Sequence, residues 1–381
     1  MNFQLTESQQ MQRNCMFAFA ERYLCGSSKT EFSKGLWKLC AARGVLSLGI
    51  PSDLTASEPT DILSAVIAME GLGQGCVDNG LPFALSTHLW TVQHPILQFG
   101  SDEIKDRYLS PMCAGELIGA HAMTEPDAGS DSAAMQTTAT ACTGGYILNG
   151  EKCLISLAPV ADVFVLFAKT NSDLGKWGIS VFLVDRCSAG VSVSKPVRKM
   201  GLTTVPMGQV TLKDCFVPAA QRLGPEGAGA SISNKSLELE RCCLLASQVG
   251  RMQKQLEDAV KVARERYQFG RSIGQFQSVS NRIADMKIRL EAAKQMLYKV
   301  AWMKTEGLST AMESAMLKLM VSESFLASSL DAIRVHGGRG YLVENEVEHD
   351  VRDSVGGVLY AGTSDIQRNI IAGMLGLKTD G

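Results

Sequence analysis

The sequence has little of what marks metal-binding, membrane-spanning or disulfide-linked proteins. Its five histidines are dispersed, and no two of its eleven cysteines have the Cys-x-x-Cys spacing of a structural zinc site, so no metal site is predicted. No uninterrupted apolar run reaches the roughly 18 to 20 residues that a membrane-spanning helix needs. The cysteines are scattered, and Cys242 and Cys243 lie in an apolar helical stretch. They predict reduced, buried thiols in a cytoplasmic protein.

An excess of charge of either sign is also missing. Lys and Arg number 37 and Asp and Glu 39, so the net charge is −2, and both signs are spread along the chain. We therefore expect no binding surface for nucleic acid and no docking patch for an acidic partner. Apolar residues make up 45% of the 381, which is enough to bury the cores of two or three domains.

Hydrophobic periodicity divides the chain into three regions. Residues 60–72 carry apolar residues at spacings of three and four, which predicts a helix. Apolar, β-prone stretches such as 163–168 predict strands in the middle of the chain, up to the glycine-rich segment 224–229. Helical periodicity then returns and continues through 310–335. The predicted domains are 1–119 (helical), 120–229 (β) and 230–381 (helical). The fold class is therefore mainly α with a central β domain.

A loop at the entry to the β domain, 124–131, combines turn-forming residues with small residues and hydroxyls. Its sequence is Thr-Glu-Pro-Asp-Ala-Gly-Ser-Asp. Such a loop can bring backbone N–H groups and hydroxyls close to a bulky polar ligand. Taken alone, the pattern fits a plain structural turn equally well.

Five blocks together resemble the acyl-CoA dehydrogenase family in order and spacing, over nearly the whole chain. They are TEPDAGSD at 124–131, NGEK at 149–152, RERYQFGRSIGQFQ at 264–277, GGRGY at 337–341 and GTSDIQR at 362–368. The resemblance implies an N-terminal helical domain, a β-barrel-like middle domain and a C-terminal four-helix bundle. It also implies FAD, held between the β domain and the C-terminal helices of two subunits in a homodimer or homotetramer.

Residues matched to the family's motifs form the predicted cofactor site. The resemblance implies that Met123 and Thr124 meet the flavin ring, that Ser130 meets its pyrophosphate, and that Ser156 meets the reactive edge of the flavin. Hydroxyl and amide donors there would stabilise the negative charge that a reduced flavin gains.

Further matched residues lie in the C-terminal region. In the family, a neighbouring subunit contributes residues that contact the pyrophosphate and adenosine of FAD. The residues that resemble them here are Arg266, Phe269 and Gln277. Those that match the remaining dinucleotide contacts are Gly337, Gly338, Thr363 and Asp365. An arginine suits a diphosphate because its guanidinium donates two parallel hydrogen bonds. Without the other motifs, Arg266 would be interpreted as a solvated helix charge and Phe269 as a core residue.

The position of the catalytic base departs from the common family pattern. Many members carry a glutamate just before the Gly-Thr of the last block, where this chain has Ala361. Alanine cannot abstract a proton, but its backbone N–H can still polarise the thioester carbonyl, as it does in the family.

Glu240 is the predicted replacement for that glutamate. On a helix it shares a face with apolar residues, whereas Glu238 faces Lys235 and Arg241. Burial would raise the pKa of Glu240 toward neutrality, which suits a general base. The alternative is a structural carboxylate paired with an arginine such as Arg241. The position matches that of the base in isovaleryl- and long-chain acyl-CoA dehydrogenases, which favours catalysis.

Several features together resemble the prolyl carrier-protein dehydrogenases of pyrrole and alkaloid biosynthesis. They are Ala361, Glu240 followed by Arg241 and Cys242, the segment 158–162, and Arg334 where many relatives carry glutamine. The resemblance implies α,β-dehydrogenation of an acyl or aminoacyl thioester, prolyl-like, on the phosphopantetheine of a carrier protein. An ordinary catabolic acyl-CoA dehydrogenase is a second hypothesis. A flavin monooxygenase or a catalytically silent binding protein on the same scaffold is a third.

The electron acceptor is left open by the sequence. Leu154 stands where many members have a tryptophan beside the flavin. The acceptor is therefore either oxygen or an electron-transferring flavoprotein.

Overall fold

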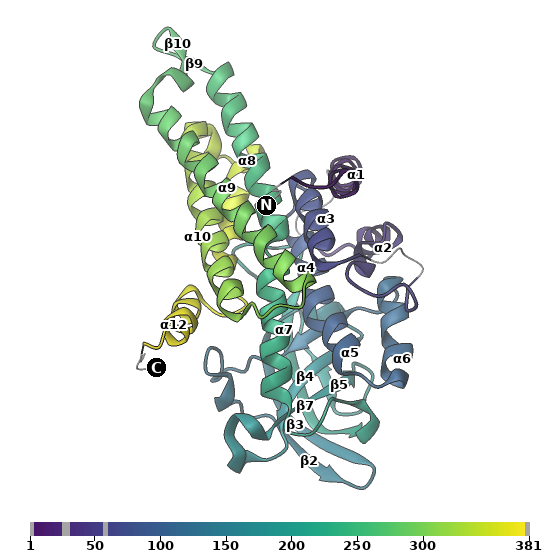
Figure 1. Ribbon diagram of the computed structural model, residues 1–381. Coiled ribbons are helices and arrows are strands. Elements are labelled where there is room, and N and C mark those ends of the chain that lie inside the picture. Colours follow the sequence, from purple (N-terminus) through teal and green to yellow (C-terminus); the bar gives the residue numbers. More distant parts are fainter. Residues whose placement is uncertain (1–3, 25–30, 56–59, 378–381) are drawn as a thin grey trace.

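The computed structural model describes residues 4–24, 31–55 and 60–377. Helices form both ends of this part of the chain and strands form its middle, as predicted (Figure 1). None of the helices in the described ranges has the length and apolar character required to cross a membrane.

The N-terminal helices begin where the sequence offers good capping residues. Thr6 accepts a hydrogen bond from the N–H of Gln9, whose side chain accepts one from the N–H of Thr6, which forms a capping box. The side chains of Ser33, Asp61 and Ser101 each accept a hydrogen bond from a backbone N–H in the first turn of a later helix. The helices are α1 (Glu7–Tyr23), α2 (Lys34–Ala42), α3 (Ile62–Gly75), α4 (Gly80–His88), α5 (His94–Phe99) and α6 (Asp102–Cys113).

The central strands form one eight-stranded sheet with the order β6-β7-β3-β2-β4-β5-β8, and β1 pairs with β4. Strands β2 and β4 are joined by the single parallel pairing of Thr138 with Lys169. The longest ladder is the antiparallel pair of β3 and β7. The strands are β1 (Gly119–Ala122), β2 (Thr138–Cys142), β3 (Gly145–Ser156), β4 (Val163–Lys169), β5 (Ile179–Asp185), β6 (Val191–Val193), β7 (Met207–Pro218) and β8 (Arg222–Leu223).

The C-terminal helices form a bundle in which α8, α9 and α10 run side by side (Figure 1). The helical periodicity that follows the glycine-rich segment 224–229 is interrupted at Leu244 and Leu245, so Glu240 lies in the last turn of a separate helix, α7. The elements are α7 (Gly229–Cys243), α8 (Ala246–Glu265), the hairpin strands β9 (Tyr267–Gln268) and β10 (Arg271–Ser272), α9 (Gln277–Thr305), α10 (Ala311–His336), α11 (Val347–Gly357) and α12 (Ser364–Met374).

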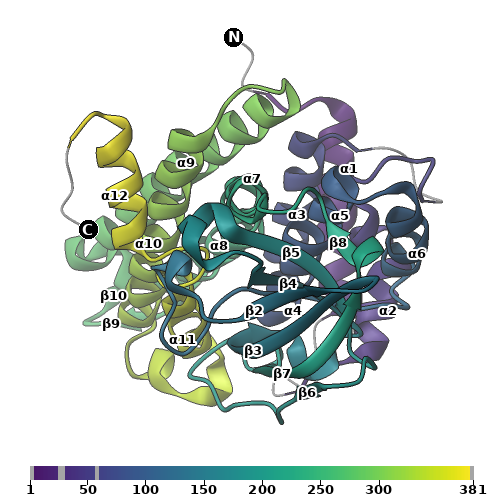
Figure 2. The same ribbon diagram turned by 90° about the horizontal axis from the view of Figure 1, so that it is seen from below.

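Two helices join the three regions. Helix α3 is buried from Ala65 to Gly75 and packs on α1, α8 and α9. Its contact with α8 is so close that a Cβ on Gly73 would lie 2.1 Å from the carbonyl oxygen of Ser247, so only glycine fits there. Helix α7 packs on α9 and α10 at one end and on β5 at the other. Figure 2 shows α7 end-on, between the sheet and the helices. This helix therefore brings Glu240 to the boundary between the bundle and the β domain.

Candidate active site

A cavity of about 590 Å³ opens where the β domain meets the turn between α11 and α12. Its volume is within the roughly 300 to 1,000 Å³ that is typical of small-molecule sites. The wall combines the loop after β1, the end of β3, the segment 199–207 and residues 352–363. The predicted site residues that lie together in this wall are Thr124, Ser130, Ser156, Ala361 and Thr363. The loop at 124–131 thus lines a cavity.

That loop is held by a buried ion pair. Lys152 on β3 is fully buried, and its Nζ lies 2.7 Å from Glu125 Oε1 and 3.1 Å from the carbonyl oxygen of Met123. Glu125 also accepts hydrogen bonds from two backbone N–H groups, at 2.5 and 3.0 Å. Burial lowers the pKa of Lys152 to about 8, although its hydrogen bond to Glu125 acts in the opposite direction. These two motif residues therefore shape the loop.

Strand β3 is irregular where it reaches the cavity. Its pairing with β7 shifts register between Lys152 and Ile155, and the backbone of Leu154 has a φ of 55°. Such a bulge redirects side chains away from the regular alternation of a strand. As a result Leu154 is 63% exposed and lines the cavity together with Ser156.

The turn that carries Ala361 is fixed from two sides. Its carbonyl oxygen accepts hydrogen bonds from Arg241 Nε and from Gln367 Nε2, both at 3.1 Å. Gln367 also donates to the carbonyl oxygen of Gly362 at 2.9 Å. Ala361 has a φ of 53°, in the left-handed region, and Thr363 then caps α12. No described residue accepts a hydrogen bond from the Ala361 N–H, so this donor is available to a ligand.

Glu240 lies beside this turn and is not part of the cavity wall itself. Its side chain is 8% exposed and forms no hydrogen bond with a described residue. Burial raises the pKa of Glu240 to about 7, against the opposing charges of Arg241 and Lys318. Burial and the charge of Glu240 together raise the pKa of Tyr360. The predicted burial and raised pKa of Glu240 are confirmed, and its role as the base stays a prediction.

Lys318 on α10 is a second buried cation near this carboxylate. It is fully buried, and no described residue accepts a hydrogen bond from its Nζ. Burial and the charge of Arg241 lower the pKa of Lys318 to about 8, against the opposing charge of Glu240. Sequence reasoning missed this residue, although its spacing from Ala315, Val321 and Phe325 places it on the buried face of a helix.

Glu238 forms its hydrogen bonds with residues outside its own helix. Its Oε1 lies 2.5 Å from Lys304 Nζ and 2.5 Å from the hydroxyl of Thr310, at the end of α9 and the start of α10. Burial raises the pKa of Glu238, but these hydrogen bonds outweigh it and lower the pKa overall. The charge of Glu238 acts on Arg241, as expected from their spacing on α7, but its hydrogen-bond partners come from the end of α9 and the N-cap of α10.

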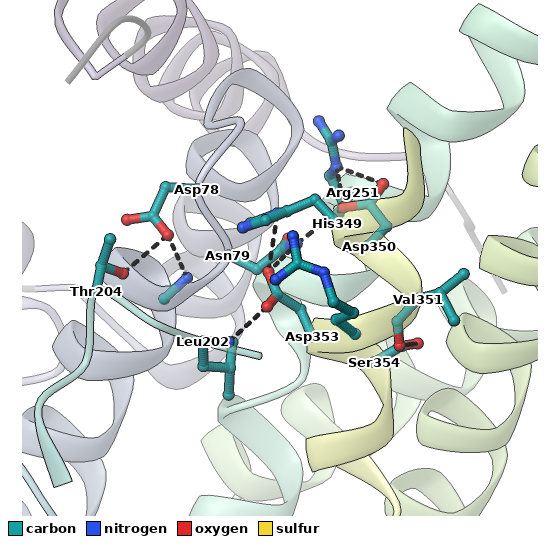
Figure 3. Close-up of polar contacts among 12 residues, drawn as sticks. Asp78, Asn79, Leu202, Thr204, Arg251, His349, Asp350, Val351, Asp353 and Ser354 are labelled. Carbon is teal, nitrogen blue, oxygen red and sulfur yellow. Dashed lines mark hydrogen bonds and ion pairs between the residues drawn. The ribbon is translucent and has the colours of Figure 1, made fainter. Parts of the chain in front are cut away.

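A buried polar network ties the cavity wall to the helices (Figure 3). Asp353 of α11 accepts hydrogen bonds from the N–H of Leu202 at 2.5 Å and from Asn79 at 3.0 Å, and it pairs with His349 at 3.1 Å. Asn79 also donates to Asp350, which Arg251 of α8 holds at 2.9 Å. The N-terminal, middle and C-terminal regions therefore meet at Asp353. Burial raises the pKa of the Asp353 carboxyl.

Other predicted residues lie far from the cavity of the same chain. The hairpin β9–β10 extends beyond the ends of α8 and α9, as Figure 1 shows at the top. Phe269 at its tip is 92% exposed, and Gln277 is exposed at the start of α9. Arg266, at the base of the hairpin, forms no ion pair with a described residue.

The remaining predicted residues are spread over three places. Gly337 and Gly338 end α10 in open space, at the same end of the bundle as the start of α9. Asp365 lies on the outer side of α12 and pairs with Arg368 at 3.0 Å. Met123 is half-buried next to the cavity, where its sulfur lies 3.7 Å from the Ser233 hydroxyl on α7.

Comparison with known proteins agrees with this arrangement. Three family models match the chain, described as acyl-CoA dehydrogenase N-terminal domain (residues 6–116), middle domain (120–215) and C-terminal domain (227–376). An L-prolyl-[peptidyl-carrier protein] dehydrogenase from a Serratia species is 42% identical, over 99% of each chain. The solved structure of the prolyl acyl carrier protein oxidase AnaB has a TM-score of 0.96 and 41% identity, over 98% of this chain and 100% of that one.

More distant relatives share the fold as well. The butyryl-CoA dehydrogenase from Megasphaera elsdenii has a TM-score of 0.94 and 32% identity, with 98% of this chain and 100% of that chain covered. Family models thus match most of the chain, and relatives of 41% and 42% identity cover 98% and 99% of it. The chain belongs to the acyl-CoA dehydrogenase family.

Proposed function

We propose that this protein is an FAD-dependent dehydrogenase that removes hydrogen from the α and β carbons of a prolyl-like acyl or aminoacyl thioester held on a carrier protein. The observation that carries the proposal is the presence of Ala361 on the turn together with Glu240 nearby. The usual base is absent from the turn, while a buried carboxylate with a pKa of about 7 lies beside it. The relatives described as prolyl carrier-protein enzymes support the substrate class.

The residues around the cavity fit a flavin. The hydroxyls of Thr124, Ser130 and Ser156 line it, and the N-terminus of α12 begins at Thr363 on the same wall. Hydroxyls and helix N-terminal N–H groups suit the ring oxygens and the phosphates of FAD. A solved relative is described as PigA with FAD and proline, with a TM-score of 0.97 and 40% identity. When bound, FAD supplies the acceptor for the hydride that leaves the β carbon.

The chain's own residues then account for the proton. The free N–H of Ala361 is placed to donate a hydrogen bond to the thioester carbonyl, which makes the α proton more acidic. Glu240 takes that proton in its ionised form. Arg241 connects the two, because it follows Glu240 on α7 and holds the carbonyl oxygen of Ala361 at 3.1 Å. The same contact keeps the Ala361 turn and the end of α7 in a constant relative position.

Anaerobic reduction of the bound flavin by a panel of thioesters tests the substrate class. We expect a prolyl or similar small aminoacyl group on a carrier protein to bleach the flavin faster than the same group on CoA. The matched control is a straight-chain acyl group on each of the two carriers. If long-chain acyl-CoA reduces the flavin fastest, the catabolic alternative replaces this proposal. If no thioester reduces the flavin, the protein is instead a monooxygenase or a catalytically silent binding protein.

Arg266, Phe269 and Gln277 lie on the projecting end of the bundle, away from their own chain's cavity. We propose that they complete the FAD site of a neighbouring subunit in a homodimer or homotetramer. Arg266→Ala should then lower FAD occupancy and oligomer stability together, since a ligand that binds only the assembled form stabilises it by mass action. Size-exclusion chromatography with flavin absorbance measures both quantities. Arg264→Ala, two residues away, is the matched control, and a monomer with full FAD occupancy would contradict the proposal.

We further propose a cytoplasmic location, which fits the absence of disulfides among the described cysteines. For the acceptor, Leu154 at the cavity leaves oxygen and an electron-transferring flavoprotein as candidates. Stopped-flow reoxidation of the reduced enzyme by each of them distinguishes the two.

A further inference from the structure

Positive charge is concentrated in one stretch of this nearly neutral chain. Between Asp185 and Asp214 there is no acidic residue, although acidic residues make up 39 of the 381. The same stretch carries five basic residues: Arg186, Lys195, Arg198, Lys199 and Lys213. The small net charge of the whole chain therefore conceals a local separation of charge, which the expectation of no docking patch for an acidic partner did not take into account.

This stretch forms the rim of the cavity. It contains β6, the start of β7 and the loop 194–206 between them, at one edge of the sheet (Figure 2). The cavity wall continues directly out of that loop through Lys199, Met200 and Leu202. A molecule that enters the cavity from this side must pass the loop.

The rim is held by hydrogen bonds and by close packing. The N–H of Val197 donates to the carbonyl oxygen of Met207 on β7 at 2.9 Å, and Lys199 Nζ donates to that of Val205 within the loop at 2.5 Å. A Cβ on Gly201 would lie 2.3 Å from the carbonyl oxygen of Arg352, so the loop lies directly against α11. A rigid surface loses little conformational entropy when a partner binds.

Two cations on this rim lack a counter-charge. Lys195 and Arg198 are exposed, and neither forms an ion pair with a described residue. Glu348, a carboxylate on the neighbouring α11, is held by Arg352 at 2.6 and 3.0 Å. Beside the cations, Val197 is 48% exposed and Met200 58% exposed. The rim thus combines free positive charge with an apolar centre.

We propose that the loop 194–200 is the docking surface for an acidic carrier domain, whose phosphopantetheine arm delivers the thioester into the cavity. The inference rests on the proposed function, because a carrier-bound thioester can reach the cavity only if its protein lies against the mouth. Opposite charges on the two surfaces accelerate encounter and set orientation, and the apolar centre provides contact area. The phosphates of free CoA would meet the same cations. The test must therefore separate binding of a carrier domain from binding of CoA.

The test is the double charge reversal Lys195→Glu with Arg198→Glu. Flavin reduction is measured with one prolyl group on three carriers: an acidic carrier protein, CoA, and pantetheine, which has neither phosphate nor protein. We expect kcat/KM for the carrier protein to fall by about tenfold or more, through KM, and to lose most of its salt dependence. The rate with pantetheine should stay within about twofold, because these residues only steer the partner. The control reversal, Lys38→Glu with Arg43→Glu at exposed positions on α2 and at its C-cap, changes the net charge equally.

Direct binding of the carrier protein, measured by fluorescence anisotropy without turnover, separates this inference from the proposed function. Weakened binding to the rim variant alone supports the docking surface even if no thioester is oxidised. Unchanged binding overturns it, as does an equal loss in both double reversals. An equal loss with CoA and carrier protein also overturns it, because the rim would then be a phosphate site.

Discussion

Glu240→Gln should leave FAD bound and lower thioester-dependent flavin reduction by about 10² to 10⁴, the usual contribution of a positioned general base. Glutamine keeps the shape of the side chain but cannot accept a proton from the α carbon. The measurement is anaerobic stopped-flow reduction of the bound flavin, with flavin content determined from the oxidised spectrum. Because the substitution acts on the chemical step, the rate should fall with little change in the apparent substrate affinity.

The pH dependence of the wild type follows from the same residue. Burial raises the pKa of Glu240 to about 7, and only the ionised carboxylate can act as the base. The rate of flavin reduction should therefore rise by about tenfold per pH unit below that value and level off above it. In Glu240→Gln this rise should be absent, which distinguishes a lost base from a general disturbance of the site.

Glu238→Gln is the matched control, but it is not a silent one. Glu238 holds Lys304 and Thr310, so its replacement should lower the thermal unfolding temperature while flavin reduction stays near the wild-type rate. The base assignment is contradicted if Glu240→Gln reduces its flavin at the normal rate. It is also contradicted if Ala361→Glu alone raises the wild-type rate severalfold, since the base would then belong on the turn.

Lys152→Met should be the most destabilising of the substitutions considered. It leaves Glu125 buried without its cation, and breaking a buried ion pair in this way typically costs about 3 to 5 kcal/mol. Because the pair holds the loop at 124–131, FAD should be lost more readily as well. Thermal unfolding and flavin release on heating measure the two effects.

A second variant separates the ion pair from simple packing. In Lys152→Met with Glu125→Gln no unpaired charge remains, so the double variant should be more stable than Lys152→Met alone. Lys213→Met, at an exposed position on β7, should change neither the unfolding temperature nor the release of flavin on heating. A double variant no more stable than the single one would show that the aliphatic part of Lys152, and not its charge, holds the loop.

The helices, the strands and some features of the site follow from local patterns in the sequence. Periodicity separates helices from strands because the two structures repeat their buried faces at 3.6 and 2 residues, and Thr6, Ser33 and Asp61 mark where helices begin. The burial and raised pKa of Glu240 could be predicted in the same way, because the apolar neighbours that cause them lie on its own helix.

Contacts between distant segments were decided only by the tertiary structure. Lys152 and Glu125 are 27 residues apart, Arg241 and Ala361 are 120 apart, and no local spacing relates them. The hydrogen-bond partners of Glu238 could not be predicted for this reason, since they come from the end of α9 and the N-cap of α10. The basic stretch at 186–213 is visible in the sequence, but only the fold places it at the mouth of the cavity. Side chains on one element obey a fixed geometry, whereas pairing across elements depends on how the whole chain packs.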